Sequence, residues 1–280
     1  MTILLLACLW VAAPPEGDTI VSVERGDVLR IQNFLGDLRV RTWDRPEVNI
    51  EFEEYRGGGI EVSRVGRRVE VRASGRRGRE RNHEYVVSVP SWLAIEIRGR
   101  ELDVWVSGLE ASLDVMTREG DISIRNHVGD VVARTFDGVL DVRASKGRFD
   151  LTSLDDDVIL FDVEGEIHVD ANDGSIELID VDATVIDAAT VDGDIEFSGR
   201  LHRNGRYQLV THDGDISFAT EAGVDAEVSV ATYDGEFETE FPIVLQRLES
   251  GRELSFVLGE GGARVRLQAF DGDIRLLRRR

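Results

Sequence analysis

Apolar residues recur every nine positions along much of the chain, with polar residues on either side of them. The ten positions in this series are Val104, Leu113, Ile122, Val131, Leu140, Phe149, Val158, Ile167, Ile176 and Val185. Two residues further on, nine of the ten equivalent positions are again apolar. Apolar rows two residues apart are typical of one face of a β-strand. Apolar spacings of three and four residues do not dominate, so the pattern predicts short strands and no helices.

A Thr-x-Asp-Gly signature returns at every second repeat, so the full repeat is 18 residues long. It reads TREG at 117, TFDG at 135, SLDD at 153, ANDG at 171, TVDG at 190, THDG at 211, TYDG at 232 and AFDG at 269. After residue 185 the other half of the repeat becomes longer, and the added residues always enter at the turn opposite Asp-Gly. We therefore expect one regular rim and one variable rim, as in a solenoid.

The expected fold is all-β. Residues 101–280 are predicted to form a parallel β-solenoid (β-helix) with about 18–21 residues per coil, in which successive coils stack on one another. Residues 18–100 lack the nine-residue spacing but still alternate, and they are predicted to form an N-terminal β-rich cap region with a hairpin about Gly66. The closing RLLRRR at 275–280 is expected to protect the edge of the last coil with charge.

Three stretches in this order resemble a known family: GDLRVRTWDRPEVNIE near the start, VVSVPSWLAIEIR at 86–98, and then many Thr-x-Asp-Gly-Asp-Ile repeats. Over residues 18–280 the chain resembles the bacterial putative-adhesin β-strand-repeat family, a domain of unknown function. The resemblance implies a β-helical, envelope-associated protein with no enzymatic role.

Charge is distributed very unevenly along the chain. The net charge is −21, yet residues 1–100 hold 16 Arg against 15 Asp and Glu, so all of the negative excess lies in residues 101–280. Such an acidic surface repels phosphate backbones, and we expect no nucleic-acid partner. The basic GRRGRER stretch at 75–81 is either a solvated hairpin tip or a contact for an anionic surface.

Residues 1–17 have the pattern of an export signal or leader. An apolar run from Ile3 to Ala13 is too short to span a bilayer but suits the hydrophobic part of a signal. Val11-Ala12-Ala13 offers small residues for cleavage, whereas Leu5-Leu6-Ala7-Cys8 is similar to a lipobox, in which lipid on Cys8 would tether the chain to a membrane. A start further upstream and a buried strand are the other interpretations. We expect an exported protein, periplasmic or at the cell surface.

The repeated Asp residues allow two interpretations. Stacked coils would place equivalent carboxylates about 4.8 Å apart in columns. The Asp before Gly can accept N–H groups of its own turn, with Gly supplying a positive φ. Alternatively, the Asp-Gly turns bind Ca²⁺, as in a calcium-binding β-roll. Cys8 is the only cysteine, so a Cys-based metal site and a disulfide are excluded.

Catalysis has little support, although a polysaccharide-active β-helix enzyme is an alternative. An Asp present in every coil does not define a unique acid–base pair, and the histidines His83, His127, His168, His202 and His212 have no metal spacing. Trp43, Trp92, Trp105 and the x residues of Thr-x-Asp-Gly are either turn packing or a sugar-binding face. We predict no catalytic, metal or cofactor residues, and a non-enzymatic scaffold that binds an envelope protein or polysaccharide.

Overall fold

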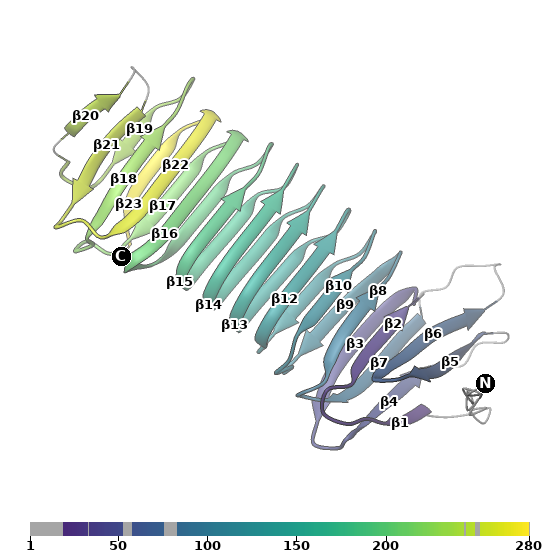
Figure 1. The fold of residues 1–280 in the computed structure, drawn as a ribbon. Coiled ribbons are helices and arrows are strands. Elements are labelled where there is room, and N and C mark those ends of the chain that lie inside the picture. The colour runs from purple at the N-terminus through teal and green to yellow at the C-terminus, as the bar shows by residue number, and fades with distance from the viewer. Residues whose placement is uncertain are drawn as a thin grey trace, which may run out of the picture.

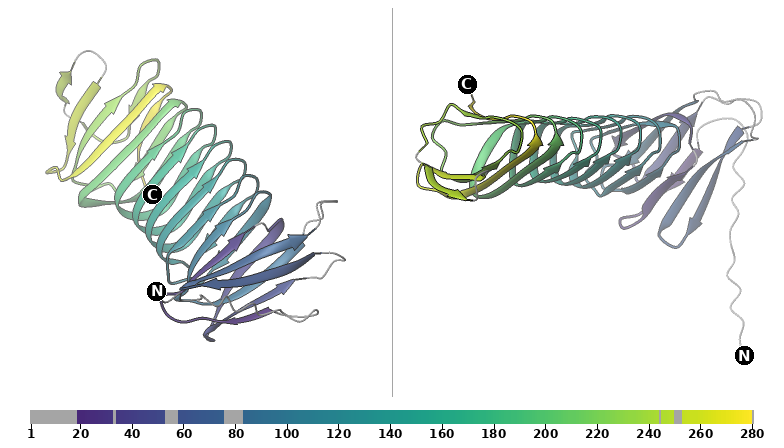
Figure 2. Two further views of the ribbon diagram at one scale, coloured as in Figure 1. Left: turned by 45° about the vertical axis from the view of Figure 1, so that its right-hand side comes forward. Right: turned by 90° about the horizontal axis from the view of Figure 1, so that it is seen from above.

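The computed structural model describes residues 19–32, 34–52, 58–75, 83–243, 245–249 and 253–279. These residues form 23 β-strands that hydrogen bonds join into one sheet, wound as a long flattened coil (Figures 1 and 2). The all-β expectation is confirmed. In the same part of the chain, no helix has the length and hydrophobicity needed to cross a membrane. The leader at 1–17 and the basic residues 76–81 lie outside the described residues.

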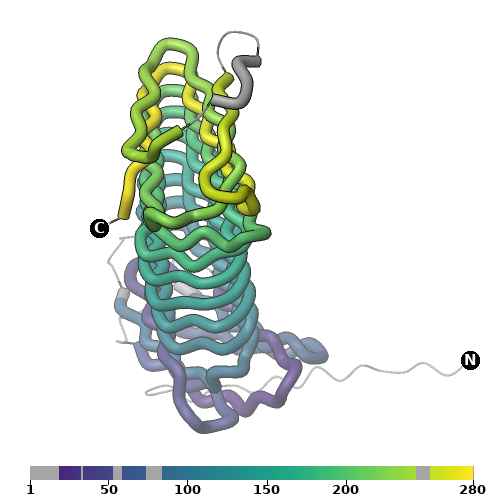
Figure 3. The backbone as a smooth tube through the Cα atoms, turned by 90° about the vertical axis from the view of Figure 1, so that its left-hand side faces the viewer, coloured from purple at the N-terminus to yellow at the C-terminus, as the bar shows by residue number. Residues whose placement is uncertain are grey.

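The strand pairings divide the coil into two faces, seen end-on in Figure 3. In stacking order, the first face contains β5 (Gly58–Val65), β6 (Arg68–Gly75), β2 (Val28–Gln32), β8 (Ala94–Arg98), β10 (Leu113–Met116), β12 (Val128–Thr135), the second halves of β13 (Leu140–Ser153), β14 (Val158–Ala171), β15 (Ile176–Ala189) and β16 (Ile195–Asp213), and then β22 (Ala263–Asp271), β18 (Ala226–Ala231), β21 (Glu253–Leu258) and β20 (Leu245–Glu249).

The second face lies on the other side of the apolar core. In the same direction it contains β1 (Thr19–Ser22), β4 (Glu47–Phe52), β7 (His83–Pro90), β3 (Gly36–Trp43), β9 (Leu102–Ser107), β11 (Ile122–Arg125), the first halves of β13 to β16, and then β17 (Ile216–Thr220), β23 (Ile274–Arg278) and β19 (Phe237–Thr239).

Parallel pairing with an 18-residue register holds the central coils together. Leu140 pairs with Val158, and Val158 pairs with Ile176, so residues of the nine-residue series lie directly above one another. Their side chains are buried, as the alternating pattern predicts. The last member of the series is an exception. A bulge in the β14–β15 pairing shifts the register by one residue, so Ile186 is buried and Val185 is half-exposed.

The corner opposite Asp-Gly accommodates the extra residues. In β16, Leu201 pairs with Ala183 and Arg206 pairs with Val185, so the four residues between them bulge from the coil. The longest insertion follows β19 and contains the β20–β21 hairpin. The predicted division into a regular rim and a variable rim is confirmed.

Both ends of the stack depart from the predicted arrangement. Antiparallel pairs occur there, including β5–β6, β1–β4 and β18–β21, and the hairpin about Gly66 is confirmed. The coils are also out of chain order, because β22 and β23 lie between the β16–β17 coil and the β18–β19 coil. At the other end, β2 and β3 lie between the β6–β7 coil and the β8–β9 coil.

This order corrects two expectations. Coils do not simply stack in sequence, and the closing arginines cannot protect the last edge, because β23 has β17 on one side and β19 on the other. The physical reason is that an inward row of apolar residues fits any neighbouring row, so the apolar pattern does not specify which coils are neighbours. Strands from 18–100 and 101–280 belong to one sheet, and the division of the chain at residue 100 stays a prediction.

Candidate functional site

The Thr-x-Asp-Gly corner is the most regular feature of the molecule, and it lies where the chain passes from the first face to the second. Its Thr side chain is buried in most coils and half-buried at Thr232. Except at Thr117, which donates to Glu119 of its own turn, the Thr hydroxyl donates a hydrogen bond to a Gly carbonyl of an adjacent coil. This distance is 2.9 Å in three coils, from Thr190 to Gly174, from Thr211 to Gly193 and from Thr232 to Gly272. The Thr hydroxyl therefore connects coils, and its burial is compensated by a partner.

The residue after Gly provides a second connection between coils, here called the inner carboxylate column. Its side-chain oxygen accepts the backbone N–H at the same position of the next coil. The acceptor–donor pairs are Asp103–Asp121, Asp121–Val139, Asp157–Ser175, Ser175–Asp194, Asp194–Asp215, Asp215–Asp273 and Asp273–Glu236, at 2.8–3.3 Å. Charge-assisted bonds of this kind stabilise carboxylates that would otherwise repel one another.

This geometry corrects the predicted role of the repeated Asp. The acceptor is the residue after Gly, and the N–H that it binds belongs to the neighbouring coil instead of its own turn. One coil has Asp156 in place of Gly. The carboxylate of Asp156 points in the other direction along the stack and accepts the N–H of Gly138, in the preceding coil, at 2.7 Å. The sequence signal for this arrangement was the repeated second Asp, which turn chemistry alone does not require.

Glycine is needed at this corner because adjacent coils touch through their backbones. A Cβ on Gly193 would overlap the carbonyl oxygen of Gly174, and a Cβ on Gly235 would overlap that of Gly272. A positive φ is not the general reason: Gly138 has a φ of 144°, but φ of Gly193 and Gly235 lies outside the left-handed range. The expected conformational role of Gly is therefore wrong for those coils, and close approach explains the residue.

Two exposed columns remain on the outside of the corner, and we call them together the outer rim. The first holds the carboxylates before Gly, which are Glu119, Asp137, Asp155, Asp173, Asp192, Asp213, Asp271 and Asp234 in stacking order. In the described part of the chain no salt bridge joins any of them to a basic side chain. The second holds the x residues, which are Arg118, Phe136, Leu154, Asn172, Val191, His212, Phe270 and Tyr233 in stacking order.

The x residues are unusually exposed for their chemistry. The exposed fraction is 56% for Phe136, 49% for Val191, 45% for Tyr233 and 41% for Phe270. The ring centroids of Tyr233 and Phe270 lie 4.5 Å apart, and those of Phe270 and His212 lie 4.7 Å apart. Packing between turns and an accessible aromatic surface therefore occur together at this end of the rim.

Trp43, Trp92 and Trp105 are each covered on one side by an arginine. Each is half-buried and has a guanidinium over its ring at 5.1–5.3 Å: Arg45 over Trp43, Arg25 over Trp92 and Arg39 over Trp105. Trp105 also lines a hollow of about 540 Å³ on the second face. A sugar-binding face that includes these residues stays a prediction.

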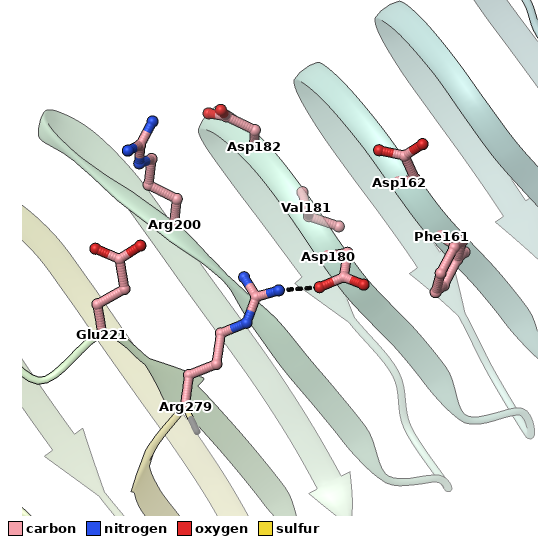
Figure 4. Close-up of a pocket in the computed structure, with 8 residues that line it drawn as sticks. All are labelled: Phe161, Asp162, Asp180, Val181, Asp182, Arg200, Glu221 and Arg279. Carbon is pink, nitrogen blue, oxygen red and sulfur yellow. Dashed lines mark hydrogen bonds and ion pairs between the residues drawn. The ribbon is translucent and has the colours of Figure 1, made fainter.

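A second hollow, of about 440 Å³, lies at the variable corner (Figure 4). Its lining residues are Phe161, Asp162, Asp180, Val181, Asp182, Arg200, Glu221 and Arg279. Arg279 forms an ion pair with Asp180, while His202 outside the hollow contacts Asp182. Among the residues described, no three or more His, Cys, Asp and Glu side chains come together in a group that could hold a metal ion.

Among the histidines whose side chains the structure describes, His127 is the one that is fully buried, which its sequence spacing did not indicate. Its side chain is fully buried, and neither ring nitrogen has a hydrogen-bond partner. Burial lowers the pKa of His127 to about 4, and the Gly129 backbone and the Asp130 charge oppose only part of this effect. Leu109, 18 residues earlier, is also buried, so comparison between repeats would have indicated an interior position.

The fold and the repeated corner define a repeat protein built from coiled β-strands. A family model described as Toastrack DUF4097 matches residues 21–277. The chain belongs to this family of unknown function, and the family resemblance is confirmed. No curated protein matches the chain.

Solved structures from three bacteria are similar to the chain over most of its length. A "putative cell adhesion protein" from Clostridium sporogenes has 11% identity and a TM-score of 0.29, covering 94% of this chain and 99% of its own. A "putative adhesin" from Bacteroides fragilis has 11% identity and a TM-score of 0.44, covering 93% and 96%. A "putative adhesin" from Parabacteroides distasonis has 10% identity and a TM-score of 0.48, with the same coverage.

Substitutions in the two carboxylate columns are expected to change the free energy of unfolding by different amounts. Asp194→Ala leaves the Asp215 N–H without its 2.8 Å acceptor, and we expect the free energy of unfolding to fall by about 1 kcal/mol. Asp192→Ala, two residues away on the outer rim, removes no hydrogen bond between described residues and should change it by less than about 0.5 kcal/mol. Urea unfolding of the two variants provides the comparison, and equal losses would contradict the assignment of columns.

His127 predicts a pH-dependent stability. The unfolded chain binds a proton near the usual His pKa of about 6.5, whereas the folded chain resists protonation until about pH 4. Stability should therefore be unaffected above pH 6.5 and should fall by up to about 3 kcal/mol between pH 6.5 and 4. His127→Leu should reduce this fall, measured by urea unfolding at pH 7.5 and 4.5. An unchanged pH profile in the variant would show that other groups control it.

Proposed function

We propose that the protein is a non-enzymatic binding or scaffold module of the bacterial cell envelope, acting in the manner of an adhesin. The observation that carries the proposal is the division of labour at the repeated corner. Thr, Gly and the inner carboxylates are used in contacts between coils, while the outer rim presents exposed apolar and acidic side chains along the stack. A long exposed rim on a rigid support suits recognition of an extended partner.

The arrangement of carboxylates supports binding over hydrolysis. A glycosidase uses one acid and one base or nucleophile on either side of the scissile bond. Here the inner carboxylates are hydrogen-bond acceptors for the next coil, and the outer ones are equivalent, exposed members of a column. Function is therefore better explained by the surface than by one reactive pair.

Export is the second part of the proposal. The apolar run from Ile3 to Ala13 and the small residues that follow it support delivery to the periplasm or the cell surface. Cys8 is the residue on which a lipid would tether the protein to a membrane. An envelope protein or polysaccharide is then the class of partner available to the rim.

This proposal predicts where the protein is found. A full chain with a C-terminal tag should be recovered with the cell envelope, and Cys8→Ser should move it from the membrane to the soluble envelope fraction if lipid holds it. The purified full chain should also be retained by isolated envelope material. Recovery in the cytosol, or no retention by envelope material, would contradict the proposal.

A calcium-binding β-roll-like module is the second candidate, and the outer carboxylates favour it, because none of them forms a salt bridge with another described residue. Neighbouring members of that column lie on adjacent coils, as the bridge between Asp192 and Asp213 shows. Carboxylate oxygens are the ligands that Ca²⁺ prefers. In this interpretation the cation would bind at the rim and stabilise contacts between coils.

Thermal melts distinguish the two candidates. A ligand that binds only the folded state at 100 times its Kd adds about 2.7 kcal/mol of stability. Under the adhesin-like proposal, millimolar Ca²⁺ should leave the melting temperature of the full chain within error of its value in chelator, with Mg²⁺ as the control. A large rise with Ca²⁺ alone would favour the calcium-binding module.

A further inference from the structure

The outer rim exposes a column of mostly apolar side chains beside a column of carboxylates. Its x residues include five large apolar side chains that remain exposed, from Phe136 at one end to Tyr233 at the other. Large apolar groups gathered along one line of the surface mark an interaction surface more strongly than the same residues scattered singly. These five side chains form one stripe because each fills the x position of the Thr-x-Asp-Gly corner in its own coil.

The adjacent column fixes the charge that a partner must have. Eight carboxylates from Glu119 to Asp234 follow one another in the stack, and no salt bridge within the described residues neutralises them. Unit charges about 4.8 Å apart repel by about 1 kcal/mol in water. A cationic partner would relieve this repulsion, whereas an anionic lipid surface or a nucleic acid would increase it.

The chemistry of the stripe also favours cations. Tyr233, Phe270 and His212 stack at one end of the rim, and two of these rings are only 4.5 Å apart. Aromatic faces attract Lys and Arg, and the methylene groups of those side chains can cover Leu154 and Val191 further along. Carboxylates beside exposed rings therefore suit long cationic side chains that carry apolar stems.

We propose that the outer rim binds an extended protein segment in which Lys or Arg residues alternate with apolar residues. Seven intervals of about 4.8 Å give the rim a length of about 34 Å, which an extended segment of about ten residues would match. The segment would lie along the stack, with its cations toward the carboxylate column and its apolar side chains over the x residues. This inference rests on the proposed binding function and names the class of partner for it.

The direct test measures binding of short synthetic peptides to the full chain by fluorescence anisotropy. The probe is a labelled 12-residue peptide of alternating Lys and Leu, and its matched control has Glu in place of every Lys. We expect binding of the Lys peptide alone, and we expect it to weaken as salt screens the carboxylates. Equal binding of both peptides, or of neither, would overturn the inference.

Rim variants identify the surface responsible. Asp155→Asn, Asp192→Asn and Asp213→Asn together remove three outer charges, and none of these side chains forms a salt bridge with another described residue. We expect the binding of the Lys peptide to weaken about tenfold. The charge-matched control replaces Glu61, Asp162 and Glu221 by their amides. These three side chains are exposed; Glu61 lies on β5, and Asp162 and Glu221 line the hollow at the variable corner.

A second variant tests the contribution of the exposed aromatic side chains of the rim. Phe270→Ser with Tyr233→Ser removes the exposed ring pair and should weaken the Lys peptide by about tenfold. The control, Val65→Ser, removes an apolar side chain that is 73% exposed on β5. Thermal melts identify any variant that fails to fold. In that case the comparison of the Lys and Glu peptides on the unsubstituted protein still tests the inference, because equal binding of both would contradict it.

The remaining outcomes separate this inference from the proposed function. If envelope material retains the protein equally with and without the rim substitutions, the rim inference is overturned while the binding function stands. If the aromatic substitutions abolish retention and the carboxylate substitutions do not, the rim binds a neutral polysaccharide and the inference is also overturned. Loss of retention in both rim variants, with both controls unchanged, would support it.

Discussion

Direct contact between the backbones of adjacent coils is the constraint on which the rest of the structure depends. At the Thr-x-Asp-Gly corner this contact excludes a Cβ, and so it requires Gly193 and its equivalents. It also brings the Thr hydroxyl and the inner carboxylate within hydrogen-bonding distance of the neighbouring coil. Two polar side chains per coil are therefore satisfied by the same approach that stacks the apolar rows.

The sequence was most informative where the structure repeats. The 18-residue register of the central coils follows from the spacing of residues such as Leu140, Val158 and Ile176, because each must face the same core. The variable rim could be predicted for the same reason: added residues at that corner leave the apolar rows intact. Periodicity thus specified the winding of the chain and the side on which it tolerates insertion.

The apolar pattern of the sequence does not specify which coils are neighbours in the stack. Nothing in the apolar row distinguishes Leu209 pairing with Leu267 from Leu209 pairing with Val230, so the place of the last coil could not be predicted. The same limit applies to Asp194, whose acceptor role depends on which N–H the next coil presents. The burial of His127 could not be predicted from its residue type, because histidine is usually only partly buried.

The candidate site follows from this division between contact and exposure. Residues that connect coils are held in place by backbone geometry, which leaves the x residues and the outer carboxylates free to vary in chemistry without loss of the fold. Asn172 and Val191 occupy equivalent positions, and so do Phe136 and His212. A surface of this kind can be altered residue by residue while its spacing stays constant.

The position of the terminal coils has a consequence for how such a protein grows in evolution. Because β22 and β23, the last described strands, lie one coil inside that end of the stack, a repeat added after them would meet no open edge. Duplication within the central coils, where the register is regular from Leu113 to Phe161, would instead insert a coil and leave both ends unchanged. Such duplication would lengthen the outer rim and keep the antiparallel pairs that lie at the two ends of the stack.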